Sequence, residues 1–166
     1  MYKYLLYFLI FSFLGWCTEV VFYIFKTGRL TNRGLAKVPF CPIYGIGICL
    51  SYLLLFRIKS FFLLSLLCMA VATLVEFFVG FFTDRILYRR LWDYTNEKGN
   101  ILGYVCPRFS VIWGVVCALT VKIIPRLDRA VFLMGSVPGF VFSFALLVMI
   151  VADSNYEILS SKSAHR

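Results

Sequence analysis

Residues 61–82 read FFLLSLLCMAVATLVEFFVGFF, and Glu76 is the one charged side chain in this stretch. A helix needs about 20 predominantly apolar residues to cross the hydrocarbon core of a bilayer, and this stretch has that length. A carboxylate inside such a helix costs about 2.5–3.5 kcal/mol on insertion scales and usually marks a functional site. The stretch therefore predicts a membrane helix and makes Glu76 the first candidate site residue.

The rest of the chain is equally apolar. Its 166 residues are 61% hydrophobic, with a mean hydropathy of +0.87, whereas soluble domains are about 45–50% apolar. Four more apolar stretches cover residues 4–25, 38–56, 104–124 and 131–152. The composition thus predicts an all-α membrane protein with five transmembrane helices. The stretch 38–56 is the least regular, since prolines and glycines crowd its first half, and it could begin as a short re-entrant or interfacial segment.

We expect a single integral membrane domain over residues 1–166. Within it, residues 1–56 would form a first helical hairpin, 57–125 a second hairpin, 126–152 a fifth, packing span and 153–166 a polar tail. The larger share of the 17 basic residues falls on the side of the C-terminus. The positive-inside rule then predicts a multi-pass protein of the cell membrane with its N-terminus outside and its C-terminus in the cytoplasm.

The formal net charge of +9 limits the classes of binding partner to be expected. Basic residues beside a membrane are attracted to anionic headgroups, so membrane lipid is an expected partner. Nucleic acid is not expected, because no basic stretch interleaved with exposed aromatic residues forms a soluble face.

A second carboxylate, Glu19, lies in the apolar stretch 4–25, and the same order of features follows both glutamates. After Glu19 come Arg29, Asn32, Arg33, Gly34 and Cys41-Pro42; after Glu76 come Arg85, Asp93, Asn100, Gly103 and Cys106-Pro107. This order predicts two hairpins that are parallel repeats, related by an axis along the membrane normal, with a binding site between them. The alternative is a coincidence among polar residues that loops contain anyway.

Helical spacing places both glutamates on polar faces. Ser12, Gly15 and Glu19 recur every three or four residues, as do Thr73, Glu76 and Gly80. Lipid tails offer these groups no partners, so both faces should point to the bundle interior or a wet cavity. Arginine pairs well with carboxylate, which makes arginines the expected counter-charges; the pairs could also simply hold helices together. The candidate substrate-binding residues are Glu19, Asn32, Arg33, Tyr44, Glu76, Arg85, Asp93 and Asn100.

The sequence offers few other chemistries. It contains no P-loop, and its one histidine, His165, lies in the tail, so a Ser-His-Asp or Cys-His arrangement is not expected. No Cys-x-x-Cys pair is present, and we expect neither a metal nor a cofactor. Glutamates with Asp84 and Asp93 could offer oxygen ligands to a hard cation. Cys41 and Cys106 each precede a proline, either as small residues before the first helical position or as a redox or metal pair.

Several strings resemble the ABC-transporter type IV family of permease-like integral membrane proteins. They are Phe13-Leu14-Gly15-Trp16 with Glu19, Asn32-Arg33-Gly34, Pro39-Phe40-Cys41-Pro42-Ile43-Tyr44-Gly45-Ile46-Gly47, Trp92-Asp93-Tyr94, Asn100 with Gly103, and Trp113-Gly114. The resemblance implies a membrane subunit with a role in transport, and it implies no catalytic residues.

The first functional hypothesis is a permease-like transport subunit that binds a polar or charged solute at a Glu/Arg site between the hairpins. It would work with a separate ATPase subunit or as a homo-oligomer. The second hypothesis is a membrane-embedded enzyme acting on a lipid or isoprenoid phosphate headgroup gripped by Arg85, Arg89 and Arg90. The third is a non-catalytic accessory or regulatory membrane protein. Because no spacing specifies a reaction, an enzyme is not our first expectation.

Overall fold

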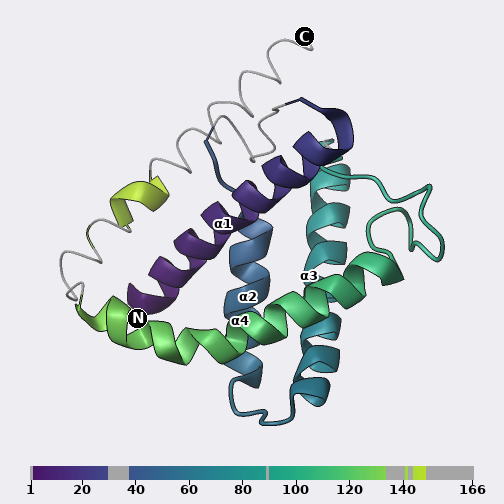
Figure 1. Cartoon of the computed structure of the whole chain (residues 1–166). Helices are drawn as coiled ribbons and strands as arrows, with labels where there is room; N and C mark the ends of the chain where they lie inside the picture. Colours follow the sequence, from purple (N-terminus) through teal and green to yellow (C-terminus); the bar gives the residue numbers. More distant parts are fainter. Residues whose placement is uncertain (1, 30–37, 89, 134–140, 142–143, 149–166) are drawn as a thin grey trace. The chain divides into compact units, whose positions relative to one another are not determined.

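The computed structural model describes residues 2–29, 38–88, 90–133, 141 and 144–148. They include the helices α1 (Tyr2–Thr27), α2 (Pro42–Leu55), α3 (Phe61–Leu87) and α4 (Pro107–Leu133) (Figure 1). Regular structure in the described residues is helical, apart from an isolated antiparallel bridge between Ile101 and Val105. The all-α fold class is confirmed.

Within the described residues, three helical segments are long and apolar enough to cross a membrane: Lys3–Thr27, Phe61–Ile86 and Pro107–Asp128. The predicted span 38–56 is shorter than expected, because α2 begins only at Pro42 and has 14 residues. At 1.5 Å per residue it is about 21 Å long, whereas a hydrocarbon core is about 30 Å thick. Most of the predicted fifth span, 131–152, and the tail lie outside the described residues, so the count of five spans stays a prediction.

Local sequence explains where the helices begin and end. Pro42 and Pro107 are the first residues of α2 and α4, as expected for a proline whose missing N–H would have no helical partner there. The Ser60 side chain caps α3 by accepting a hydrogen bond from the Leu63 N–H. One predicted boundary is wrong: α4 continues through Pro125 to Leu133 and does not end near 124.

Contacts divide the chain into two compact units. The first unit is Met1–Gly45 together with Asp128–Arg166, and the central unit is Ile46–Leu127. The boundary falls inside α2, one turn after its start, whereas the sequence places a boundary between hairpins at 56 and 57. The hairpin boundaries stay a prediction.

In the first unit, α1 packs closely against the chain around the start of α2. The Cys41 N–H donates to the Ser12 carbonyl at 3.0 Å. A Cβ atom on Gly45 would overlap the Ser12 hydroxyl and lie 2.5 Å from the Phe8 carbonyl oxygen. Only glycine permits this approach. Near the N-terminus, the buried Tyr7 hydroxyl donates to Asp128 at 2.7 Å.

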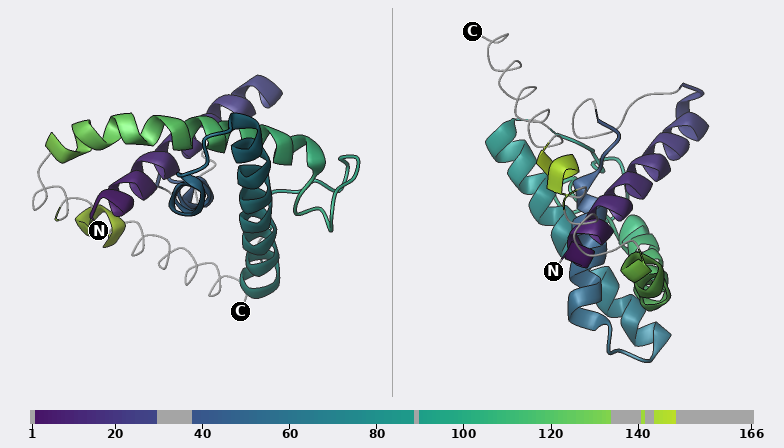
Figure 2. Two further views of the ribbon diagram at one scale, coloured as in Figure 1. Left: turned by 90° about the horizontal axis from the view of Figure 1, so that it is seen from below. Right: turned by 90° about the vertical axis from the view of Figure 1, so that its left-hand side faces the viewer.

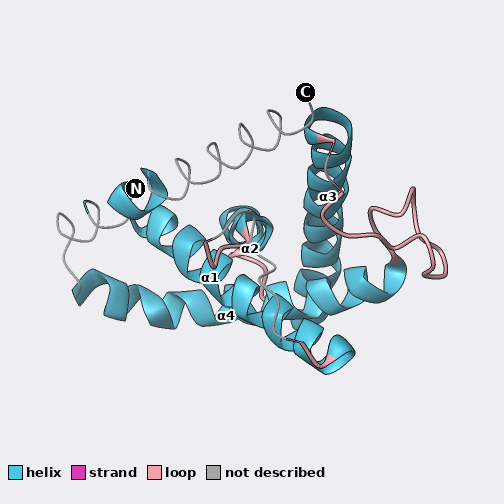
Figure 3. Ribbon diagram, turned by 90° about the horizontal axis from the view of Figure 1, so that it is seen from above, coloured by secondary structure: helices cyan, strands magenta, loops and turns pink. Residues whose placement is uncertain are grey.

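In the central unit, α3 and α4 cross steeply (Figure 2). Their close approach also depends on a glycine, since a Cβ on Gly114 would lie 2.7 Å from the Met69 Cβ and 2.8 Å from the Ser65 carbonyl oxygen. At the other end of the pair, the Lys122 ammonium donates to the carbonyls of Ile58 and Lys59 in the turn between α2 and α3. The connection from α3 to α4 is the long loop in Figure 3.

Candidate functional site

Glu19 accepts a hydrogen bond from the Tyr44 hydroxyl, with 2.6 Å between the Tyr44 Oη and Glu19 Oε1 atoms. Both side chains are half-buried. Gly15 lies one turn before Glu19 on α1, and a Cβ there would overlap the Tyr44 side chain, at 2.5 Å from its Cβ and 2.6 Å from its Cδ2. The glycine predicted on this polar face therefore makes room for the tyrosine that reaches the carboxylate.

Glu76 also accepts a tyrosine hydroxyl, from Tyr94, with 3.0 Å between Tyr94 Oη and Glu76 Oε1. This carboxylate is more deeply buried than Glu19, with 5% of the residue exposed. Tyr94 belongs to the loop between α3 and α4, and its ring stacks on Phe109 with centroids 4.9 Å apart and planes 17° from parallel. A loop residue thus closes over a carboxylate that lies within an apolar helix.

Asn100 orders the loop that carries Tyr94. Its amide nitrogen donates to the carbonyls of Thr95 and Glu97, at 3.1 and 2.8 Å, and its Oδ1 accepts from the Gly103 N–H at 3.0 Å. Gly103 has a φ of 73°, a left-handed conformation that favours glycine. The Tyr94 N–H then donates to the Gly103 carbonyl at 2.9 Å, which fixes the tyrosine backbone.

Asp93 stabilises the same loop. Its Oδ1 accepts from the Thr95 N–H at 2.9 Å and from the Thr95 hydroxyl at 2.8 Å, and it pairs with Arg90 at 3.3 Å. These contacts lower the pKa of Asp93. The hydrogen bond from the Thr95 N–H has the largest effect, followed by the bond from the Thr95 hydroxyl and then by the charge of Arg90. Arg90 also donates to the Leu102 carbonyl at 2.9 Å.

A third tyrosine ties the loop to the end of α3. The buried Tyr104 donates its hydroxyl to Asp84 at 2.7 Å, and this bond raises the pKa of Tyr104. Arg85, which is exposed, also bonds to Tyr104. The indole N–H of Trp92 donates to the Tyr104 carbonyl at 2.8 Å. Asp84 and Arg85, one expected as a cation ligand and the other as a counter-charge, thus both contact this tyrosine.

The structure brings together two pairs: Glu19 with Tyr44, both predicted, and Glu76 with Tyr94, which sequence reasoning missed as a site residue. The signal for Tyr94 was the Trp92-Asp93-Tyr94 string, one of the strings that carry the family resemblance. Asp93 and Asn100 order the loop around Tyr94, and their predicted role in binding stays a prediction. Asn32 and Arg33 lie outside the described residues.

The described residues contain no group of three or more His, Cys, Asp or Glu side chains placed to hold a metal ion. Cys41 and Cys106 are buried cysteines in different units, each directly before the first residue of a helix. Their position is that expected for small residues before a helix-starting proline.

Comparison with known proteins gives one family. The model of the family described as "Putative ABC-transporter type IV" matches residues 6–158. The chain belongs to this family, and it is a membrane protein with long apolar helices. Searches of curated proteins and of solved structures find no match.

Proposed function

We propose that the chain is a permease-like transport subunit that binds a polar or positively charged solute at Glu76 and Tyr94. Glu19 and Tyr44 would form a second site of the same kind. One observation carries the proposal: Glu76 is 5% exposed, lies in the otherwise uncharged stretch 61–82, and contacts a tyrosine hydroxyl delivered by an ordered loop. Ionisable groups at such positions typically line substrate or ion pathways.

The chemistry of the pair favours a hydrogen-bond donor or a cation as the solute. An ionised carboxylate only accepts hydrogen bonds, and a phenol that donates to it retains acceptor capacity. The stacked rings of Tyr94 and Phe109 also offer π faces, which attract cations. The Arg108 guanidinium already lies 5.8 Å from the centre of the Phe109 ring. An anionic solute would meet the Glu76 charge unfavourably. The role of Arg33 and Arg85 as counter-charges to the glutamates stays a prediction.

Transport against a gradient needs an energy source that this sequence does not encode in a P-loop. The family description supports a separate ATPase subunit as partner, with a homo-oligomer as the alternative. The enzyme hypothesis has less support, because Arg90, one of its three phosphate-binding candidates, already contacts Asp93 and the Leu102 carbonyl.

The proposal includes the internal repeat, and matching contacts support it. Gly45 approaches Ser12 and Phe8, which lie seven and eleven residues before Glu19. Gly114 approaches Met69 and Ser65, which lie seven and eleven residues before Glu76. The two glycines differ by one helical turn in their distance from the preceding Cys-Pro. Each glutamate-bearing helix would thus be crossed at an equivalent place.

The orientation of the chain is part of the same proposal, with the N-terminus outside. Lys59 and Lys98 are exposed residues on opposite predicted sides. In the Lys59→Cys and Lys98→Cys variants, a membrane-impermeant maleimide applied to intact cells should label position 59 above the native background and leave position 98 unlabelled. The reverse pattern would invert the topology.

Binding of solute is tested with the purified chain in lipid nanodiscs. We expect choline, putrescine or arginine to raise the melting temperature of the wild type and glutamate to leave it unchanged. The Glu76→Gln variant should lose the response, whereas Glu97→Gln, which removes a carboxylate from the loop, should keep it. A response to glutamate, or an unaltered response in Glu76→Gln, would contradict the proposal.

A further inference from the structure

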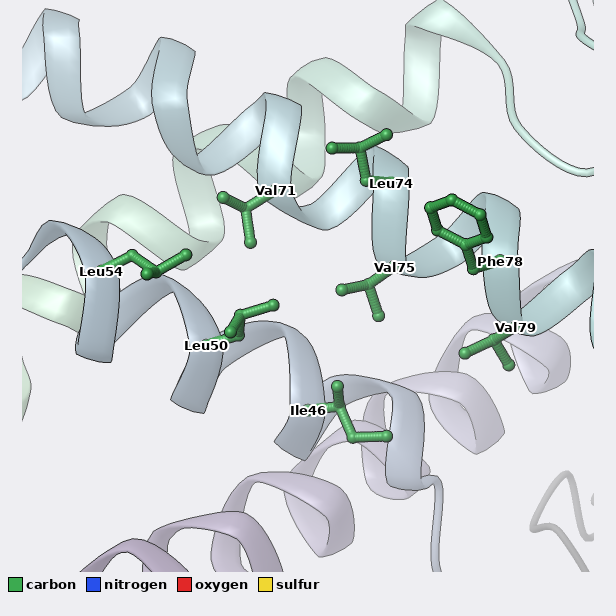
Figure 4. A pocket seen from close by; sticks show the side chains of 8 residues that line it. All are labelled: Ile46, Leu50, Leu54, Val71, Leu74, Val75, Phe78 and Val79. Atoms are coloured by element: carbon green, nitrogen blue, oxygen red, sulfur yellow. The ribbon is translucent and has the colours of Figure 1, made fainter.

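An apolar groove runs between α2 and α3 within the central unit (Figure 4). Its volume is about 370 Å³. Figure 4 shows side chains of the two helices facing each other across it, and every lining side chain is apolar. They are Ile46, Leu50 and Leu54 from α2, with Val71, Leu74, Val75, Phe78 and Val79 from α3. Pockets for polar solutes contain at least a few placed polar groups. This groove therefore suits a hydrocarbon and does not suit the solute proposed for Glu76.

The groove opens to the surroundings of the protein. Leu54, Leu74 and Phe78 are 60%, 57% and 51% exposed. In a membrane protein, such side chains face lipid tails. From Leu54 to Ile46 the α2 wall is about 12 Å long, at 1.5 Å per residue. A groove of this kind can hold part of one acyl chain laid along the helices.

One end of the groove is positively charged. Arg57 lies about one turn beyond Leu54 and is exposed, with its guanidinium 5.4 Å from the centre of the Phe56 ring. Lys59 is exposed in the same turn, and the Lys122 ammonium reaches that turn through the carbonyls of Ile58 and Lys59. Three cations thus gather where α2 ends and α3 begins.

No carboxylate of the central unit lies near this turn. Its acidic residues are Glu76, Asp84, Asp93 and Glu97. Glu76, the nearest along α3, is separated from Phe61 by about 22 Å of helix. The other three come still later in the chain, at the end of α3 or in the following loop. The charge at the turn is therefore not neutralised from within the unit, and it is complementary to an anion at the level of the headgroups.

We infer that the α2–α3 groove binds an anionic phospholipid of the surrounding membrane. One acyl chain lies along Leu54, Leu50 and Val75, and the headgroup phosphate contacts Arg57 and Lys59. Because α2 is only 14 residues long, the charged turn lies close to the groove. One lipid can therefore place an acyl chain in the groove and its phosphate at the turn. The site is separate from Glu76 and Tyr94 and does not depend on the role proposed for them.

Native mass spectrometry of the full chain tests this inference. The protein is released from detergent micelles that contain equimolar phosphatidylglycerol and phosphatidylcholine with identical acyl chains. We expect the wild type to retain phosphatidylglycerol in preference. The Arg57→Gln/Lys59→Gln variant should lose this preference, by roughly fivefold for each cation removed.

Two charge controls and one variant of the groove make the result specific. Lys26→Gln/Lys98→Gln makes the same change in charge at two exposed residues that are not part of the turn, and it should keep the preference. Arg57→Lys/Lys59→Arg keeps both charges and should keep it too. Leu50→Trp fills the groove and should reduce the binding of both lipids.

An unchanged preference in Arg57→Gln/Lys59→Gln would overturn the inference, as would an equal loss in the Lys26→Gln/Lys98→Gln control. A second copy of the chain is the competing occupant of the groove. A lipid-free dimer that Leu50→Trp dissociates would show that the second copy, and not a lipid, fills it.

Discussion

The two membrane carboxylates obtain their tyrosine hydroxyls by different routes. In the first unit, Tyr44 comes from the first turn of α2, two residues after Pro42. In the central unit, the residue two after Pro107 is Phe109, which has no hydroxyl. There the hydroxyl comes from Tyr94 in the loop, whose ring stacks on Phe109. The same hydrogen bond is thus made once by a helix and once by a loop.

This difference changes how accessible the carboxylates are. Glu19, contacted by a helix residue, is half-buried, whereas Glu76, contacted by a loop residue, is 5% exposed. A helix holds its tyrosine in place, but a loop can move without disturbing the packing of the helices. Under the function proposed above, the loop that carries Tyr94 would control access to Glu76 in the central unit.

Each unit should lose stability when a larger side chain replaces the glycine at its close helix contact. We expect Gly45→Leu and Gly114→Leu each to lower the free energy of unfolding by about 3 kcal/mol, because overpacking forces the backbones apart. Gly47→Leu is the matched control, since a Cβ there meets no atom within 4 Å. Unfolding in mixed micelles with rising dodecyl sulfate measures the change. Equal losses at 45 and 47 would show that the glycine contact is unimportant.

Removing the tyrosine hydroxyls should lower the free energy of unfolding by different amounts at the two carboxylates. A hydrogen bond to a charged group contributes about 1.5–3 kcal/mol, and we expect Tyr94→Phe to lose an amount in this range. Tyr44→Phe should lose about 0.5–1.5 kcal/mol, because water or headgroups can reach the half-buried Glu19 in place of the hydroxyl. The same unfolding assay compares them. A larger loss at Tyr44 would reverse our ranking of the two sites.

The sequence predicted the membrane class and indicated prolines at the starts of α2 and α4, because these depend on local composition and on proline itself. It also named Glu19 and Tyr44 as site residues, but it did not predict the hydrogen bond between them. It could not pair Glu76 with Tyr94, because that contact depends on the loop conformation fixed by Asn100 and Gly103. The end of α4 was missed because Pro125 removes a single hydrogen bond, which the surrounding helix tolerates.

Loosening the loop should affect the central unit alone. Asn100→Ala removes three hydrogen bonds to the loop backbone, and we expect it to lower the free energy of unfolding by about 1–2 kcal/mol. Hydrogen exchange measured by mass spectrometry should rise in residues 93–104 and stay unchanged in α1. Asn96→Ala, at an exposed position of the same loop, is the control. Equal exchange in the Asn100→Ala and Asn96→Ala variants would show that the Asn100 hydrogen bonds do not hold the loop in place.

The smallest effect concerns pH. The pKa of Asp93 is lowered in the folded loop, so the folded state binds fewer protons than the unfolded state at acid pH. Its contribution to stability is present above the usual aspartate pKa of about 3.9 and is lost as the pH falls through the lower folded value. Between pH 5 and pH 3, the melting temperature of Asp93→Asn should fall less steeply with falling pH than that of the wild type. An identical pH profile in the variant would contradict this.

The most direct test of the central claim is an electron cryomicroscopy structure of the chain in native lipid, with the cation that gives the largest melting shift. We predict that Tyr94 Oη lies within hydrogen-bond distance of Glu76 and that density for the cation contacts this carboxylate. A structure with Glu76 directed into lipid, or with the cation bound away from both glutamates, would contradict the account.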